Sequence, residues 1–245
     1  MSYVIEKRLM SGLPNTSLKA AKYVIAHESG NAKNCGPNAL ENEIAFMNRN
    51  KANAFTSHWV GGGGKIVQLA PVNKVQYGCG PKGNPLSYAQ VELARTSDKE
   101  QFKKDYAAYI WLLRKLAKDA GIPIVLDGSG NGIKSHRWIT NNLGGTTHVD
   151  PYSYLQSMGI SEVHFKQDIK NGVINEPTKP TAPVKPKEET KMPNTLTSTG
   201  KQDLKALLKD AKTKGILKLD HSEKVDSMTD GEALSLLISV VKRTL

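Results

Sequence analysis

The proline-rich stretch NEPTKPTAPVKPKEETKMPN, residues 175–194, limits what this chain can fold into more than any other feature. It contains five prolines, and lysine, glutamate and threonine fill most of the other positions. Proline fixes the backbone and cannot donate a hydrogen bond, and the polar side chains between the prolines offer no core. We therefore predict a semi-rigid linker at 175–193, between a first domain at 1–174 and a second region at 194–245.

The first domain contains several segments with strand patterns. KYVIAH (22–27) and AQVELAR (89–95) are apolar and β-branched enough for buried strands, and IPIVLD (122–127) has the same character. AFTSHWV and KIVQLA flank Gly61–Gly64 as the two arms of a hairpin. A phosphate-binding loop is disfavoured there, because Ile66 stands where such a loop needs a hydroxyl residue.

Helical patterns alternate with these strands. Residues 36–50 carry apolar side chains at helical spacing, and a longer helix is expected between a capping box of Ser97 with Glu100 and the breaker Gly121. Two shorter helices are expected from residues that favour helix starts, namely Asp150 or Ser153 for one and Ser161 for the other. This order predicts an α/β fold with a mixed central β-sheet flanked by helices.

The second region, 194–245, is predicted to be a small all-α module with two amphipathic helices. The apolar stripes are Leu204, Leu207, Leu208 and Ala211 on the first helix, and Leu234, Leu237, Ile238, Val241 and Leu245 on the second. The expected capping boxes are Thr199 with Gln202 and Thr229 with Glu232. So small a region buries little apolar surface by itself, and we therefore expect a homo-oligomer through these helices, a cell-wall-binding module, or both.

The net charge of +11 favours a polyanionic partner such as nucleic acid, anionic lipid or an acidic cell-wall polymer. The basic residues are spread along the chain without a nucleic-acid reading motif, so we expect no nucleic acid partner. No apolar run approaches the roughly 18 residues that span a bilayer, so we expect no membrane insertion. Glu6, Lys7 and Arg8 interrupt the N-terminal stretch where a secretory signal needs an apolar run, and we therefore expect synthesis in the cytoplasm.

The two cysteines, Cys35 and Cys79, form no CxxC pair. Free thiols are the expectation for a chain made in the cytoplasm, and a disulfide formed after release stays open. Asp127, in VLDGSG, is the best spare carboxylate of the chain, although a turn residue is the better interpretation.

The stretch SHRWITNNLGGTTHVDP, 135–151, contains His136, His148 and Asp150, and His27 ends a predicted strand. Zinc prefers imidazole nitrogen and carboxylate oxygen, and a catalytic zinc site keeps three protein ligands and one open position. His27, His136 and Asp150 supply that set if the fold brings the two segments together. Two simpler interpretations stay open: His27 is structural, and Asp150 caps a helix that begins at the following proline.

The ordered motifs VIAHES, SHWVGGGGKIVQLAP, VEL and HVDP resemble the zinc-dependent N-acetylmuramoyl-L-alanine amidases, the family that includes the peptidoglycan recognition proteins. The resemblance covers roughly residues 1–172, and MSYVIEKRL and HVDPYSYLQSMGI resemble the phage and prophage lysins within it. The resemblance implies a mixed sheet flanked by helices and a zinc-bearing groove that binds peptidoglycan. It implies one zinc ion held by His27, His136 and Asp150.

The same resemblance implies roles for four further residues. Glu92 takes the place of the catalytic glutamate, and His148 stands where many members carry a lysine that contacts the reacting carbonyl. A histidine donates that hydrogen bond only when the relevant nitrogen is protonated. The region of His58 and Trp59 lines the groove in the family, although a packed histidine fits His58 equally well, and Trp59 fits either core or groove wall.

The implied activity is hydrolysis of the amide bond between N-acetylmuramic acid and L-alanine in bacterial peptidoglycan. As in an endolysin, the protein would reach the wall after release from the cytoplasm through a holin, and peptidoglycan with its anionic wall polymers would be the partner. The alternative is a recognition module that binds peptidoglycan and has lost the chemistry. Asp150 and Glu92 argue against that alternative, because such modules typically lack the third ligand.

Overall fold

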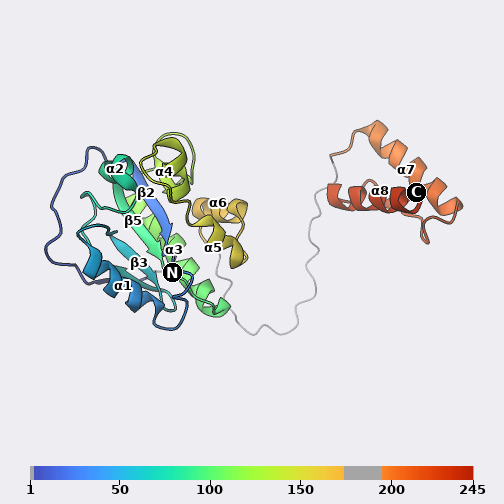
Figure 1. The fold of residues 1–245 in the computed structure, drawn as a ribbon. Helices are drawn as coiled ribbons and strands as arrows, with labels where there is room; N and C mark the ends of the chain where they lie inside the picture. Colours follow the sequence, from blue (N-terminus) through green and yellow to red (C-terminus); the bar gives the residue numbers. More distant parts are fainter. Residues whose placement is uncertain (1–2, 174–194, 245) are drawn as a thin grey trace. The chain divides into compact units, whose positions relative to one another are not determined.

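The structure is a computed structural model that describes residues 3–173 and 195–244 (Figure 1). The chain divides into two units whose boundary falls between Pro177 and Thr178. That boundary lies in the proline-rich segment, which is outside the described residues, so the semi-rigid linker and its limits stay predictions. Each unit is described by itself.

A six-stranded sheet forms the centre of the first unit, in the order β1-β4-β3-β5-β2-β6. Its strands are β1 (Ile5–Lys7), β2 (Tyr23–Glu28), β3 (His58–Gly61), β4 (Lys65–Gln68), β5 (Ser87–Leu93) and β6 (Gly132–Ser135). β3 and β4 form the predicted hairpin and run antiparallel, whereas the other neighbouring pairs are parallel. The sheet is therefore mixed, as predicted.

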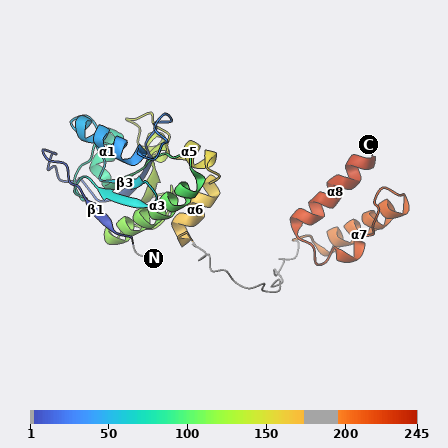
Figure 2. The same cartoon turned by 90° about the horizontal axis from the view of Figure 1, so that it is seen from below.

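Helices cover both faces of this sheet, and Figure 2 shows β3 between α1 and α3. The helices of this unit are α1 (Ala39–Asn50), α2 (Gly80–Gly83), α3 (Lys99–Asp119), α4 (His136–Asn142), α5 (Tyr152–Ser157) and α6 (Glu162–Asn171), with a 3-10 turn at Asn84–Leu86. Helices α3, α5 and α6 share one hydrophobic cluster with the sheet. Helices α1 and α4 bury apolar residues in two other clusters, on the opposite face. The fold class predicted from the sequence is confirmed.

The start of α3 differs from the predicted capping box. The carboxylate of Asp98 accepts hydrogen bonds from the backbone N–H groups of Glu100 and Gln101, at 2.8 and 3.1 Å. Ser97 instead donates its hydroxyl, at 3.4 Å, and its backbone N–H, at 3.1 Å, to the carbonyl of Cys35. A tertiary contact thus occupies the serine, and the neighbouring aspartate caps the helix.

The predicted strand IPIVLD is wrong, and a strand at Gly132–Ser135 was not predicted. Val125 N–H donates to the carbonyl of Pro123 at 2.9 Å, and this tight turn interrupts an extended backbone. Only a single bridge, between Leu126 and Ile133, remains of the expected strand. The sheet edge is formed by β6, which pairs in parallel with β2.

The second unit contains α7 (Ser198–Thr213), a 3-10 turn at Ser222–Lys224 and α8 (Asp230–Thr244), so the all-α module is confirmed. Thr197 caps α7 by accepting from Gly200 N–H at 3.1 Å, so the box predicted at Thr199 is wrong. The box of Thr229 with Glu232 is confirmed, because Thr229 N–H donates to the Glu232 carboxylate at 2.8 Å.

The two predicted apolar stripes of this unit differ in their burial. Leu204, Leu208 and Ala211 of α7 are buried in the unit's core. On α8 the core positions are Ala233 and Val240. The predicted α8 stripe is solvent-exposed at Leu234, Leu237, Ile238 and Val241, and Leu245 lies outside the described residues. In the described part of the chain, no helix has both the length and the apolar character to cross a membrane.

Candidate metal centre and groove

Strand register brings the first site residues together. In the parallel pairing of β2, β5 and β3, His27 and Trp59 are both register partners of Glu92. Side chains of register partners lie on the same face of a sheet, so these three share one face. Val91 and Leu93, which alternate with Glu92 along β5, belong to the core cluster on the α3 side. The alternation of side chains along β5 therefore turns the Glu92 carboxylate away from that core.

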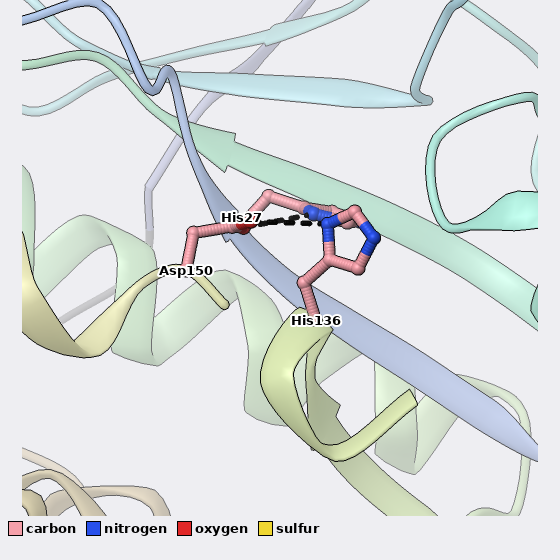
Figure 3. Close-up of side chains that lie close together, drawn as sticks. All are labelled: His27, His136 and Asp150. Carbon is pink, nitrogen blue, oxygen red and sulfur yellow. Dashed lines mark hydrogen bonds and ion pairs between the residues drawn. The ribbon is translucent and has the colours of Figure 1, made fainter. Parts of the chain in front are cut away.

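His136 and Asp150 complete a cluster with His27 (Figure 3). His136 is the first residue of α4, directly after β6, and Asp150 lies in the loop before α5. The Asp150 carboxylate oxygens lie 3.1 Å from His27 Nδ1 and 3.0 Å from His136 Nδ1. One ligand atom from each residue lies within 4.8 Å of the others. The fold thus brings together the set proposed from the sequence.

Buried hydrogen bonds hold the two histidines in place. Tyr109 on α3 donates its hydroxyl to the carbonyl oxygen of His27 at 2.8 Å. Asp127 accepts from both the backbone N–H and the hydroxyl of Ser135, each at 2.7 Å. Ser135 in turn caps α4 by accepting from Trp138 N–H at 3.0 Å. Asp127, at φ 51°, is therefore a turn residue that anchors the start of the helix carrying His136.

Asp150 does not cap α5. That helix begins at Tyr152 after Pro151, and no side chain caps it. Burial would raise the pKa of Asp150, but hydrogen bonds to His136 and His27 outweigh burial and hold that pKa well below its ordinary value. The aspartate is therefore ionised, and it faces two imidazole nitrogens.

The two imidazoles respond differently to this carboxylate. Burial opposes a charge on His27, yet the nearby Glu92 and Asp150 carboxylates raise its pKa to about 9. For His136, burial prevails and lowers the pKa. The Asp150 carboxylate faces Nδ1 of both rings, and two imidazoles with one carboxylate form a donor set that suits zinc. The residues present fit the metal that the resemblance implies.

Glu92 lies beside this cluster with one unused oxygen. Its Oε2 is buried and has no hydrogen-bond partner among the described residues. Burial raises the pKa of Glu92 to about 8, although the charge of His27 opposes that rise. A buried carboxylate with a free oxygen and a pKa close to neutrality can both accept and return a proton.

His148 lies at the exposed side of the cluster. Its ring stacks on that of His136, with centroids 5.0 Å apart and an interplanar angle of 6°. Its side chain is exposed, and it forms part of the groove wall. From this position the His148 ring can contact a molecule bound in the groove, while the Asp150 carboxylate faces His27 and His136.

A groove of about 920 Å³ contains the cluster. Its wall includes His27, Glu92, His136, His148 and Asp150, and it continues along α1 past Phe46 and Asn50. Trp59 also lines it, although that side chain is only 3% exposed and donates its indole N–H to Met47 Sδ at 3.2 Å. Trp59 therefore serves as a packed wall.

His58 does not line the groove. It is the register partner of Val91, so its side chain points toward the face covered by α3, and it is 1% exposed. Burial lowers its pKa to about 4, and its Nδ1 lies 2.9 Å from Ser57 Oγ. The placement in the groove is corrected: His58 is a packed histidine, because strand alternation separates it from Trp59.

Two polar residues of the site were not found from the sequence. Gln90 Oε1 lies 3.1 Å from His27 Nε2, and Thr146 Oγ1 lies 2.9 Å from His136 Nε2. Strand alternation gives a signal for Gln90, two residues before Glu92, whereas nothing in the loop sequence singles out Thr146.

Cys35 and Cys79 are both free thiols.

The sequence profile described as N-acetylmuramoyl-L-alanine amidase matches residues 17–153 of this chain. The endolysin of Listeria phage A511 is 49% identical over 201 residues, which cover 80% of this chain and 58% of that protein. The lytic amidase of Streptococcus pneumoniae phage HB-3 is 43% identical over 171 residues, covering 68% of this chain and 52% of that protein. This chain thus spans a little over half the length of these relatives.

Solved structures share the fold. The crystal structure of Staphylococcus aureus hydrolase AmiA in complex with its ligand superposes with a TM-score of 0.63 at 24% identity, covering 69% of this chain and 83% of AmiA. The solution structure of the PlyG catalytic domain gives a TM-score of 0.53 at 20% identity, covering 73% of this chain and 99% of that domain. At these identities the likeness concerns the fold alone.

Proposed function

The chain belongs to the N-acetylmuramoyl-L-alanine amidase family, and we propose that it is a zinc-dependent endolysin. It would cut the amide bond between N-acetylmuramic acid and L-alanine of bacterial peptidoglycan. Members of this family are generally zinc-dependent. The observation that carries the proposal is the convergence of His27, His136 and Asp150 in one groove. Beside them lies a buried oxygen of Glu92 that has no hydrogen-bond partner within residues 3–173 and 195–244.

In the proposed site, His27 and His136 would hold zinc through Nδ1, and Asp150 through its carboxylate. When bound, zinc activates a water molecule and polarises the scissile carbonyl. Glu92 would take a proton at its free Oε2 and later return it to the leaving amine of L-alanine. The raised pKa of Glu92, about 8, supports both halves of that exchange near neutral pH.

His148 would donate a hydrogen bond to the oxygen of the reacting carbonyl from the open side of the groove. Its exposure and its stacking on His136 support that role. Trp59 would form a rigid wall behind the substrate, because its ring is held by packing and by the bond to Met47.

The reaction is tested by digesting defined peptidoglycan and identifying the new chain end. We expect a newly freed L-alanine amine and no new reducing sugar end. A reducing end would identify a glycosidase and refute the amidase proposal. Binding of walls without turnover would instead support the recognition-module alternative.

Two variants separate the metal from the proton transfer. Asp150→Ala should lose zinc and wall lysis together, because the carboxylate bridges both histidines. Glu92→Gln should keep zinc and lose ~10²–10⁴-fold in rate, since the amide keeps the shape but cannot take the proton. Asp150→Ala with undiminished zinc affinity, or Glu92→Gln within threefold of the parent rate, would contradict these assignments.

We propose further that the second unit self-associates through the exposed stripe Leu234, Leu237, Ile238 and Val241. The acidic residues Asp230 and Glu232 lie in the first turn of α8, and Lys242 and Arg243 lie in its last turn. In an antiparallel pair of α8 helices, the acidic end of each would meet the basic end of the other, with the stripes between them. Several attached copies would bind a wall more tightly than one.

Light scattering of the full chain tests this second proposal. The parent should be dimeric or larger at tens of micromolar, and Leu237→Glu should be monomeric with unchanged zinc content. A monomeric parent would refute self-association, and the unit would then be a wall-targeting module.

We propose that the protein is synthesised in the cytoplasm and reaches the cell wall after release through a holin.

A further inference from the structure

The buried side chain of Gln90 contacts the ring of His27, and the proposed chemistry gives this contact no role. Its side chain is fully buried on β5, and its Oε1 lies 3.1 Å from Nε2 of His27. Gln90 is the register partner of Ile25, two residues before His27 on β2, so it lies on the same face of the sheet as that ligand. The other ring nitrogen of His27, Nδ1, faces Asp150 at 3.1 Å.

A chain of hydrogen bonds settles which end of the Gln90 amide faces His27. The backbone N–H groups of Gly78 and Cys79 donate to Asn84 Oδ1, at 3.2 and 2.9 Å, so that atom is an acceptor. Gln90 Nε2 donates to this same Asn84 Oδ1 at 3.3 Å and to the carbonyl of Gln76 at 3.2 Å. The oxygen of Gln90 is therefore the atom turned toward the imidazole.

This orientation determines which nitrogen keeps its proton when the His27 ring is neutral, as a metal-binding histidine must be. An amide oxygen only accepts hydrogen bonds, so Nε2 of His27 must be the donor. In the neutral ring one nitrogen carries a proton and the other a lone pair. The lone pair is then on Nδ1, the nitrogen that faces Asp150.

We propose that Gln90 is a positioning residue that holds His27 in the tautomer and ring orientation required to bind a metal through Nδ1. The inference rests on the proposed zinc site. Groups that accept the second N–H of a ligating histidine fix its ring and raise its basicity, and their loss typically costs roughly 10–100-fold in metal affinity.

The surrounding backbone is built to place this amide. A Cβ atom at Gly78 would lie 2.3 Å from Gln90 Oε1 and 2.7 Å from Thr56 Cγ2, so only glycine leaves room there. The backbone N–H of Gln90 is held by Gln76 Oε1 at 2.9 Å and by Ser57 Oγ at 3.1 Å. The close approach of Gly78 and the two bonds of Nε2, to Asn84 Oδ1 and the Gln76 carbonyl, leave the side-chain amide little freedom to turn away from His27.

The test compares two buried glutamines of the same network. Gln90→Leu removes the acceptor of His27. Gln76→Leu is the matched control: Gln76 is equally buried, and its side chain bonds Gln90 only at the backbone N–H, which Ser57 Oγ also holds. The Gln76 carbonyl that accepts from Gln90 Nε2 is kept in this variant, and no contact with His27 is removed. Gln90→Glu restores an acceptor oxygen. Zinc dissociation constants of the full chain are measured by competition with a chelator, and urea unfolding reports the loss of stability in each variant.

We expect Gln90→Leu to bind zinc ~10–100-fold more weakly. Gln76→Leu should stay within about threefold of the parent at a comparable loss of stability, and Gln90→Glu should bind more tightly than Gln90→Leu. In the zinc-loaded parent, ¹⁵N NMR of the His27 ring should show a protonated Nε2 and a metal-bound Nδ1. In Gln90→Leu that single pattern should be lost.

Parent-like zinc affinity and an unchanged His27 pattern in Gln90→Leu would overturn the role of Gln90. Equal weakening of zinc binding in Gln90→Leu and Gln76→Leu would also overturn it, because the effect would then follow stability alone. A parent chain that binds no zinc would be a different outcome, since it refutes the proposed metal site itself.

Discussion

Replacement of Asp127 should destabilise the fold and loosen the metal site together. Its carboxylate accepts three hydrogen bonds, from the N–H and hydroxyl of Ser135 at 2.7 Å each and from the hydroxyl of Tyr152 at 2.5 Å. Ser135 is fully buried and caps the helix that begins with His136. Asp127 also has φ 51°, a backbone region that most residues avoid.

The magnitude follows from these contacts. Asp127→Gly leaves the two buried donors of Ser135 without an acceptor, at about 1–3 kcal/mol each, so we expect a loss of about 2–6 kcal/mol. Asp127→Ala adds the cost of a left-handed backbone for alanine, about 1 kcal/mol, and should be the least stable variant. Asp127→Asn tolerates that backbone and keeps one acceptor, so its loss should be about 1 kcal/mol.

Urea unfolding of the three variants measures these differences, and chelator competition measures zinc affinity in parallel. The order of stability should be Asn, then Gly, then Ala, with zinc affinity falling in the same order, because Ser135 positions His136. If Asp127→Ala unfolds with a free energy within about 1 kcal/mol of the parent's, the anchoring role is refuted. A loss that small is no more than the cost of a single unsatisfied buried donor, and two are expected. Alanine more stable than glycine would refute the backbone argument.

Three further outcomes are expected. Burial lowers the pKa of His58 from 6.5 to about 4, so between these pH values the unfolded chain binds a proton that the folded chain excludes. The free energy of unfolding should therefore fall by about 3 kcal/mol as the pH drops from 6.5 to 4. His58→Leu should show a shallower acid loss in urea midpoints, and an unchanged acid slope would contradict that burial. His148→Ala should lower the rate of wall digestion by ~10²-fold while zinc content is retained, and His148→Lys should recover much of it; loss of zinc in the alanine variant would contradict the assignment. Treatment with a chelator should abolish lysis and added zinc should restore it, whereas lysis that survives complete zinc removal would refute the metal dependence.

Much of the first unit's framework could be predicted because the signals are local. The apolar run before His27 predicts a strand, and the glycines at Gly61–Gly64 predict a hairpin turn; β2 and the β3–β4 pair confirm both. The period of apolar residues predicts α1 and α3, and Ser161 caps α6 as predicted. Each of these features depends on residues close together in the chain.

Contacts between distant residues explain two of the failures, at Ser97 and His58, whereas the strand expected at 122–127 is lost to a local turn. The cap of α3 moves to Asp98 because Cys35, far away in sequence, takes Ser97 as a partner. Val125 closes a turn and leaves the sheet edge to β6. His58 and Trp59 are neighbours in sequence with the same expected environment, and the register of β3 against β5 sends only Trp59 to the groove.

By itself, the sequence determined the chemical types at the site: two imidazoles, two carboxylates and the spacing that resembles the amidase family. The tertiary structure alone decided which nitrogen of each histidine faces Asp150, and which oxygen of Glu92 lacks a partner in the part of the chain that the structure describes. It also decided that Gln90 and Thr146 hold the far side of the two rings. The physical reason is that residue type and local periodicity are properties of a short segment. Proton location, burial and hydrogen-bond direction depend on atoms that meet only after strands and loops more than 60 residues apart have packed together, as His27 does with Gln90 and Asp150.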